Sequence, residues 1–301
     1  MRKKHSSPDW KKIPIKRDSI LTMGNGGIGL AETTRQFKQP PISMLLDKRT
    51  NPELLKSMID RKPWANIFLY DLASRKLNSR DIKTLTLNSD GDDLTNPNVY
   101  GGDWDHQLGW IMYYRELTEN VLDQKPNKIY SPFGTGVLFS TLEYSLSNRA
   151  DGVQSEINGY ERIEREFGVP GIGIPGYIRW EQAKRRLAKI GKIEIYGAEP
   201  AVYPSAAGSL SAPWKPSREG VAANLRYWQE KKPLLSKKSG IEDLSEVELI
   251  EGSRILQQEG SPHGIQTGVS GAAGASLALK HFREGKIPRN NKVVVINTGT
   301  D

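Results

Sequence analysis

Three short glycine-containing turns hold the residue types that could bind an anionic ligand in this 301-residue chain. The first is "TMGNGG", residues 22–27, the second is "PFGTGVL", residues 132–138, and the third is "NTGTD", residues 297–301. Each turn directly follows an apolar run typical of a strand. Glycine leaves backbone N–H groups open to a ligand because no Cβ stands in the way. The three turns are therefore the candidate binding elements of the chain.

The first turn allows two interpretations. Gly24, Gly26 and Gly29 match G-x-G-x-x-G, the fingerprint of dinucleotide-binding proteins, and Asp47 follows at a distance that suits a ribose ligand. The same spacing also occurs in tight strand-to-helix turns that bind nothing. Asn25 favours a different ligand, because its amide can donate to a ring oxygen while neighbouring N–H groups bind a carboxylate.

The second and third turns have distinct chemistry. Gly134, Thr135, Gly136 and Val137 lie between a strand and a helix start, where backbone N–H groups and the helix dipole attract a phosphate. The Lys-Ser/Thr pair of a P-loop is absent, so this turn suits a phosphate that is held and not transferred. In the third turn, the hydroxyl of Thr298 could contact a heterocyclic nitrogen.

Strand-like and helix-like segments alternate around these turns, which predicts mostly parallel sheets covered by helices. Ligands of such sheets bind beyond the carboxyl ends of the strands. Ser245 and Glu248 form an expected capping box of a helix that ends at Gly260. We expect a basic arm at 1–17, a smaller α/β domain at 18–100 and a larger one at 101–301. We also expect a linker at 88–105, a loop-rich insert at 145–176 and a buried final strand, "KVVVINTG".

Composition excludes several classes of protein. The chain has no cysteine, which rules out disulfides and thiolate sites and suits the cytoplasm, and its four histidines are scattered, so no metal is expected. No apolar run is long enough to cross a membrane, and no signal peptide is evident. Much of the net charge of +8 comes from the first seventeen residues, which show neither interleaved aromatic residues nor a recognisable nucleic-acid module, so nucleic-acid binding is disfavoured.

Several motifs resemble the pyridoxal-phosphate enzymes of the tryptophan-synthase-β type (fold type II), above all threonine synthase and threonine dehydratase. "TMGNGGIGLAETTR" is similar to the Asn loop of that family, "KIYSPFGTGVLFSTL" to its phosphate loop and "IYGAEP" to a conserved strand. The run from "LSEVELIEG" through "SGAAG" to "VVVINTG" follows the closing part of the family in order. The resemblance covers roughly residues 18–301, with gaps in 145–176, and implies a two-lobed α/β fold.

The resemblance also implies a cofactor and roles for individual residues. The cofactor is pyridoxal 5'-phosphate, with Asn25 at its 3-hydroxyl oxygen, residues 134–137 at its phosphate, and Thr298 or, alternatively, Ser270 at its pyridine nitrogen. The implied cofactor-binding residues are Asn25, Gly134, Thr135, Gly136, Val137, Thr298 and Ser270, and those near the substrate carboxylate are Thr22, Met23, Gly24 and Gly26. The implied reaction is β-elimination or β/γ-replacement on a small hydroxy- or phosphohydroxy-amino acid, as in threonine synthase.

The lysine that carries the cofactor in this family lies upstream of the Asn loop. Lys3 and Lys4 are the candidates far enough upstream, whereas Lys16 in "KRD" is too close to the first strand. We therefore expect a piece of a longer or split protein, or a member without this lysine. The alternatives are a non-catalytic member that binds cofactor or amino acid, and a nicotinamide-dependent oxidoreductase. Expected partners are a small amino-acid substrate and a second copy or a partner chain.

Overall fold

The computed structural model describes residues 19–21, 28, 31–32, 35–38, 41–50, 52–60, 64–70, 104–134, 136–167, 173–208, 210 and 239–299. The chain divides into two compact units, Met1–His106 with Ala212–Pro216 and Gln107–Ser211 with Ser217–Asp301. The domain boundary predicted at residues 100 and 101 falls outside the described residues. Each unit contains a sheet of its own, and the two sheets are described separately below.

The first unit contains a three-stranded parallel sheet in the order β1-β2-β3. Its core is formed by Ala31, Met44, Leu46 and Ala65, all buried. Alternating positions of β2 enter this core, as expected for a strand with a period of two. Its elements are β1 (Ser19–Leu21), β2 (Ile42–Asp47), α2 (Pro52–Ile59) and β3 (Ala65–Tyr70).

The second unit contains a four-stranded sheet in the order β6-β5-β4-β7, in which every pair is parallel. The prediction of mostly parallel, helix-covered sheets is confirmed for both units. The elements of the second unit are α4 (Trp104–Asp123, which begins in the first), β4 (Lys128–Pro132), α5 (Val137–Phe167), α6 (Gly173–Ile190), β5 (Glu194–Pro200), β6 (Gly240–Leu244), α8 (Glu246–Gly260), η4 (Ser261–His263), α9 (Ala273–Arg283) and β7 (Val293–Val295).

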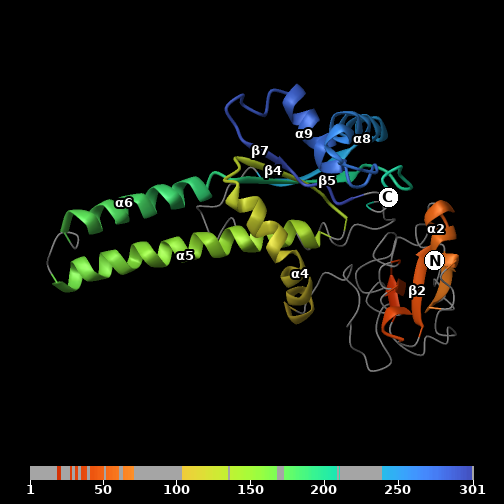
Figure 1. Ribbon diagram of the computed structural model, residues 1–301, viewed down its shortest axis with the longest axis horizontal. Coiled ribbons are helices and arrows are strands. Elements are labelled where there is room, and N and C mark those ends of the chain that lie inside the picture. The colour runs from red at the N-terminus through yellow and green to blue at the C-terminus, as the bar shows by residue number, and fades with distance from the viewer. Residues whose placement is uncertain are drawn as a thin grey trace, which may run out of the picture. The chain divides into compact units, whose positions relative to one another are not determined.

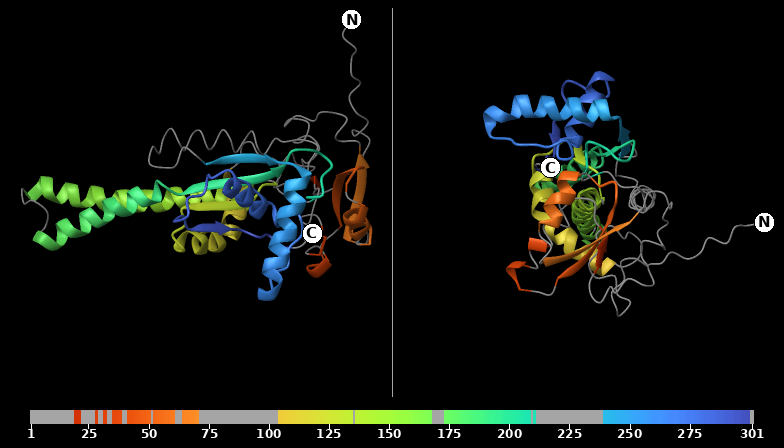
Figure 2. Two further views of the ribbon diagram at one scale, coloured as in Figure 1. Left: turned by 90° about the horizontal axis from the view of Figure 1, so that it is seen from above. Right: turned by 90° about the vertical axis from the view of Figure 1, so that its right-hand side faces the viewer.

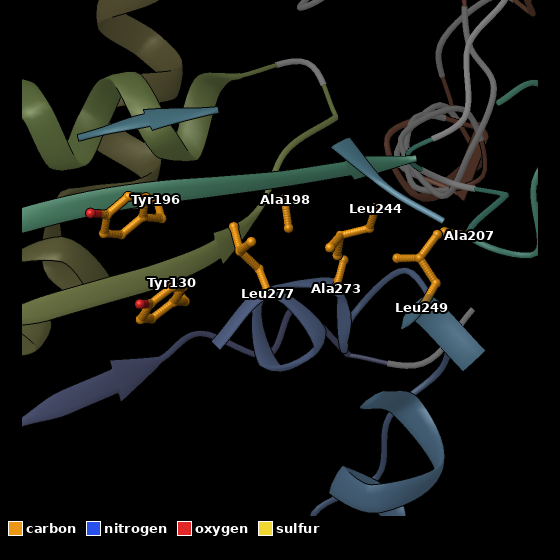
Figure 3. Packing of buried hydrophobic residues seen from close by; sticks show 8 residues of the cluster. All are labelled: Tyr130, Tyr196, Ala198, Ala207, Leu244, Leu249, Ala273 and Leu277. Atoms are coloured by element: carbon orange, nitrogen blue, oxygen red, sulfur yellow. The ribbon is translucent and has the colours of Figure 1, made fainter. Parts of the chain in front are cut away.

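Helices cover both faces of this second sheet (Figures 1 and 2). On one face, α8 and α9 pack over the strands, and Leu277 of α9 lies among Tyr130, Ala198 and Leu244 in one buried cluster (Figure 3). On the other face lies α5. A Cβ at Gly197 of β5 would lie 3.1 Å from the Phe139 ring of that helix. Gly197 therefore allows α5 to approach the sheet closely.

Helices α5 and α6 form an antiparallel hairpin with a core separate from that of the sheet (Figure 1). Ala150 and Ile157 of α5 contact Ala183 and Leu187 of α6, and both helices follow a spacing of three and four residues. The prediction of a loop-rich insert at 145–176 was wrong, because α5 continues to Phe167 and α6 begins at Gly173. The glycines of this stretch obscured its helical periodicity; Gly152 and Gly159 lie within α5 in open space.

One further expectation needs correction. The final strand is an edge strand and not a buried one, because β7 pairs only with β4 within the described sheet, and Val295 is 37% exposed. The α-helix predicted to end at Gly260 does end there, and the short helix η4 follows it directly and ends at the left-handed Gly264, with φ +74°. The expected capping box is present: Ser245 accepts from the Glu248 N–H, and Glu248 accepts from the Ser245 N–H.

Candidate functional site

The predicted phosphate loop joins the carboxyl end of β4 to the first residue of α5. The N–H of Phe133 donates to the carbonyl of Ala198 at 2.8 Å, which holds the start of the loop against β5. Gly136 has φ +81°, a left-handed conformation that strains any residue with a side chain. Its carbonyl accepts from the Ser140 N–H at 2.9 Å, so the helical hydrogen-bond ladder begins at this glycine.

The position of this loop at a helix start gives it a preference for anions. The first N–H groups of a helix have no acceptor within the helix, and the helix dipole adds a partial positive charge there. Gly134 and Gly136 carry no side chains that could cover the first N–H groups of α5. The described part of the loop fits the phosphate group of a cofactor. Thr135 lies outside the described residues.

The turn after β7 lies beside this loop along the same edge of the sheet. Tyr130 of β4 pairs with Val295, and the N–H of Ile296 donates to the Tyr130 carbonyl at 2.8 Å. Neighbouring parallel strands are about 4.8 Å apart and end at the same edge. The residues that follow them, Gly134 and Thr298, therefore share the carboxyl edge of the sheet. Thr298 is exposed there.

The "SGAAG" segment that begins at Ser270 fits against β4 only because of its glycines. A Cβ at Gly274 would lie 3.0 Å from the Tyr130 carbonyl oxygen and 3.1 Å from the Ser131 nitrogen. A Cβ at Gly271 would lie 2.1 Å from the Gly299 carbonyl oxygen, a distance at which backbone atoms must move. The segment therefore packs directly on the central strand and on the turn after β7.

The two hydroxyl groups proposed for a pyridine nitrogen differ in exposure. Ser270 is 4% exposed, whereas Thr298 is open to solvent. The structure brings these residues together with Gly134, Gly136 and Val137 at one edge of the second unit. The other predicted site residues, Lys3, Lys4, Thr22, Met23, Gly24, Asn25, Gly26 and Thr135, lie outside the described residues.

Asp47, considered above as a ribose ligand, is fully buried at the end of β2. Its carboxylate accepts from the Arg49 N–H at 2.8 Å, and its carbonyl accepts from the Thr50 N–H at 2.9 Å. These contacts stabilise the turn after β2. A buried carboxylate with this local role is a poor ribose ligand, which disfavours the dinucleotide interpretation.

A buried carboxyl group that the sequence did not single out lies on α5. Glu143 is 6% exposed, two turns after the phosphate loop, and burial raises its pKa well above the ordinary value of 4.5. It has no hydrogen-bond or ion partner in the part of the chain that the structure describes. A glutamate in an amphipathic helix is usually exposed, so no local pattern reveals this burial.

The amino end of the same sheet contains a buried polar network that sequence reasoning also missed. The Tyr130 and Tyr196 rings stack with centroids 5.2 Å apart, and His281 of α9 lies edge-on to both. The Tyr196 hydroxyl donates to Glu194, which also binds Lys128. These residues lie on three elements distant in sequence. Only the topology brings them together, so their spacing carries no signal.

Burial dominates the titration of this network. It raises the pKa of Tyr130, with smaller contributions from the carboxylates of Glu194 and Glu242, and it raises the pKa of Tyr196 in the same way. Burial lowers the pKa of His281, and Glu242 opposes this effect in part. The two tyrosines and the histidine are therefore neutral near pH 7.

Neither a metal cluster nor a membrane-spanning helix occurs in the described part of the chain. No group of three or more His, Cys, Asp or Glu side chains among the described residues could hold a metal ion. No described helix is long and apolar enough to cross a bilayer.

The fold is that of the fold type II pyridoxal-phosphate enzymes, as comparison with solved structures shows. An O-acetylserine-dependent cystathionine β-synthase from Helicobacter pylori aligns with a TM-score of 0.54 and 15% identity, over 93% of this chain and 74% of that one. A hydrogen sulfide-producing enzyme from Fusobacterium nucleatum aligns with a TM-score of 0.53 and 16% identity, over 95% and 79%.

An O-ureido-L-serine synthase variant aligns with a TM-score of 0.54 and 15% identity, over 93% of this chain and 71% of that one. No protein-family profile matches the chain. No curated protein sequence matches it either. The similarity to known proteins therefore lies in the fold, and the sequence has diverged far from the solved examples.

Proposed function

We propose that the chain binds pyridoxal 5'-phosphate and acts in elimination or replacement chemistry on a small amino acid. The observation that supports the proposal is the pairing of β4 with β7, which brings the glycine loop after β4 and the exposed Thr298 after β7 to the same edge of the sheet. Residues Gly134, Gly136 and Val137 would hold the phosphate. Thr298 would donate to the pyridine nitrogen, or Ser270 in its place.

The bound cofactor would supply an electron-withdrawing ring that makes the Cα–H of an amino acid acidic. The protein would orient the cofactor by contacts at two places: the glycine loop would bind the phosphate, and a neutral hydroxyl would contact the pyridine nitrogen. A hydroxyl group does not protonate this nitrogen fully, unlike a carboxylic acid. This choice suits loss or exchange of a group at Cβ more than reactions that need a strongly stabilised carbanion.

The solved neighbours support an amino-acid substrate with a leaving group at Cβ. They include an O-ureido-L-serine synthase, a fungal L-serine ammonia-lyase from Rhizomucor miehei and an O-acetylserine-dependent enzyme. A serine-type substrate is therefore the first to test. The threonine-synthase-like reaction remains a prediction from the sequence, as does a partnership with a second copy or another chain.

The test starts with titration of the purified chain with pyridoxal 5'-phosphate, followed by incubation with serine, O-acetylserine, threonine and O-phosphohomoserine. We expect saturable binding and release of ammonia and a keto acid, or an exchanged amino acid, from at least one substrate. Borohydride reduction followed by peptide mapping would identify the lysine that carries the cofactor. Failure to bind the cofactor would refute the proposal.

A glycine variant of the loop provides the matched control. Gly136→Ala places a side chain at φ +81°, so we expect a large loss of cofactor affinity. Gly264→Ala has a comparable positive φ of +74° at the end of η4, away from the loop. It should lower stability and leave the affinity for cofactor unchanged. Binding without turnover would favour the non-catalytic alternative.

A further inference from the structure

The side chain of Asn297 joins the turn after β7 to the segment before α9. Its Oδ1 accepts from the Thr267 hydroxyl at 3.0 Å and from the Gly299 N–H at 3.2 Å. Its Nδ2 donates to the Gln266 carbonyl at 3.0 Å. The main chain fixes the orientation of this amide, because a backbone N–H can only donate and a carbonyl can only accept.

The residues on both sides of Thr298 are therefore held. Asn297 is held by its side chain, and Gly299 is held by that same side chain and by its carbonyl, which accepts from the Gly268 N–H at 3.2 Å. The bare Cα of Gly271 allows the Gly299 carbonyl to approach. Gly299 itself has φ +106°, which is open to glycine and strained for other residues.

We propose that Asn297 is a positioning residue that presents the Thr298 hydroxyl to a nitrogen heterocycle, with Thr267 as its support. The inference rests on the proposed function and goes beyond it by naming the side chains that orient the contact. A hydroxyl held in place before a ligand arrives loses little freedom on binding, which strengthens the contact. Because Ser270 is buried, Thr298 is the exposed one of these two candidate hydroxyl residues.

If Asn297 served only to hold β7 in the sheet, its hydrogen bonds would be redundant. Strand β7 already pairs with β4, and the Ile296 N–H donates to the Tyr130 carbonyl. At the opposite end, Asn127 accepts from the Lys292 N–H at 2.7 Å through its Oδ1. Asn127 and Asn297 thus brace the two ends of one strand, and Asn127 lies at the edge away from the candidate site. Asn127→Ala is therefore a matched control.

The first experiment measures binding of pyridoxine 5'-phosphate, whose alcohol group cannot react with a lysine. Asn297→Ala and Thr298→Val should each weaken this binding about two- to tenfold, the range of one hydrogen bond. Neither change should alter binding of inorganic phosphate, which has no ring. The double variant should bind no more weakly than Thr298→Val alone, because Asn297 acts through that hydroxyl. Asn127→Ala should destabilise the protein without changing either affinity.

The second experiment needs no ligand. Amide hydrogen exchange at Gly268 and Gly299 should accelerate in Asn297→Ala and in Thr267→Val, and should return to normal in Thr267→Ser, which keeps the hydroxyl. Independent, additive losses from Asn297→Ala and Thr298→Val would overturn the positioning role, as would unchanged exchange. If the unsubstituted protein binds inorganic phosphate but not pyridoxine 5'-phosphate, or binds neither, the proposed function fails and the inference falls with it. If the unsubstituted protein binds pyridoxine 5'-phosphate and the affinity losses of Asn297→Ala and Thr298→Val add up, the positioning role of Asn297 is refuted and the proposed function stands.

Discussion

The hydroxyl oxygen of Tyr130 lies 3.0 Å from Nδ1 of His281, and Nε2 of the same ring lies 2.8 Å from Glu242. An ionised Glu242 can only accept, so Nε2 carries the proton and Nδ1 accepts from the tyrosine hydroxyl. One neutral tautomer of His281 therefore satisfies both neighbours. Lys286 lies near enough to disfavour a positive charge on the ring, whereas Glu242 and Glu284 favour it.

Acid should destabilise the second unit through His281. Burial lowers the pKa of the folded imidazole below its ordinary value of 6.5, so the unfolded chain binds this proton more tightly. The stabilisation that the neutral His281 contributes to the folded state is complete above pH 6.5, and it is lost as pH falls through the lowered pKa of the folded protein. Chemical denaturation at several pH values should show this loss as a fall in the free energy of unfolding. In His281→Gln the free energy of unfolding should depend less on pH. The exposed His263→Gln is the control, and equal slopes in both variants would contradict the assignment.

Glu143 should produce the opposite trend. Burial raises its pKa in the folded protein, so the folded state binds this proton more tightly than the unfolded chain. Its favourable contribution is complete below about pH 4.5 and is lost as pH rises through the raised pKa. Glu143→Gln, which mimics the neutral form, should therefore raise the free energy of unfolding at pH 8. The exposed Glu161→Gln should not, and a loss of stability in Glu143→Gln at pH 8 would count against a neutral carboxyl.

The crossing of α8 and α9 depends on one glycine. A Cβ at Gly252 would lie 2.1 Å from Oγ and 2.5 Å from Cα of Ser276. Gly252→Ala should therefore destabilise the protein by about 1–3 kcal/mol through overpacking. Gly159→Ala is the matched control because that position in α5 has open space around it, and it should stabilise by about 0.5–1 kcal/mol. Thermal or chemical unfolding measures both, and equal effects would contradict the close contact.

The capping box at the start of α8 gives another measurable effect. Ser245→Ala removes the hydroxyl that accepts from the Glu248 N–H, and should cost about 0.5–2 kcal/mol of unfolding free energy. Ser155→Ala, at an exposed position inside α5, should not destabilise, because alanine is the better helix former. The cap also lowers the pKa of Glu248: burial pushes it upward, but donation from Ser245 and the nearby Lys280 outweigh that effect. A carboxyl NMR titration of Ser245→Ala should show the pKa rising.

Local patterns predicted most of these elements well. The capping box and the alternation of strands with helices each depend on a few neighbouring residues, and the structure confirms them. The loop-rich prediction for 145–176 failed because it extended the glycine- and proline-rich character of "GVPGIGIPG" at its end to the whole stretch, most of which is helical. The burial of β7 was overestimated because three valines indicate a strand but not its place in the sheet.

The candidate site was predictable only in part. Glycine loops and strand ends are local features, so Gly134, Gly136 and Thr298 could be proposed from the sequence. The hydrogen bonds of Asn297 could not be predicted, because its partners Gln266 and Thr267 lie about thirty residues earlier in the sequence. They contact Asn297 only because α9 packs over β4. The burial of Glu143 and His281 likewise depends on packing, to which no local pattern corresponds.

The edge position of β7 has a consequence for the order in which the chain can fold. The α5–α6 hairpin joins neighbouring segments, whereas the contact between Asn127 and Lys292 spans 165 residues. During synthesis the hairpin and the β4–β5 pair can form early, and one edge of β4 waits unpaired until residues 293–295 emerge. Such an edge can pair with strands of other chains, so aggregation competes with the pairing of β7 that completes the sheet. The predicted phosphate loop is therefore synthesised well before Thr298, the hydroxyl that we propose completes the site.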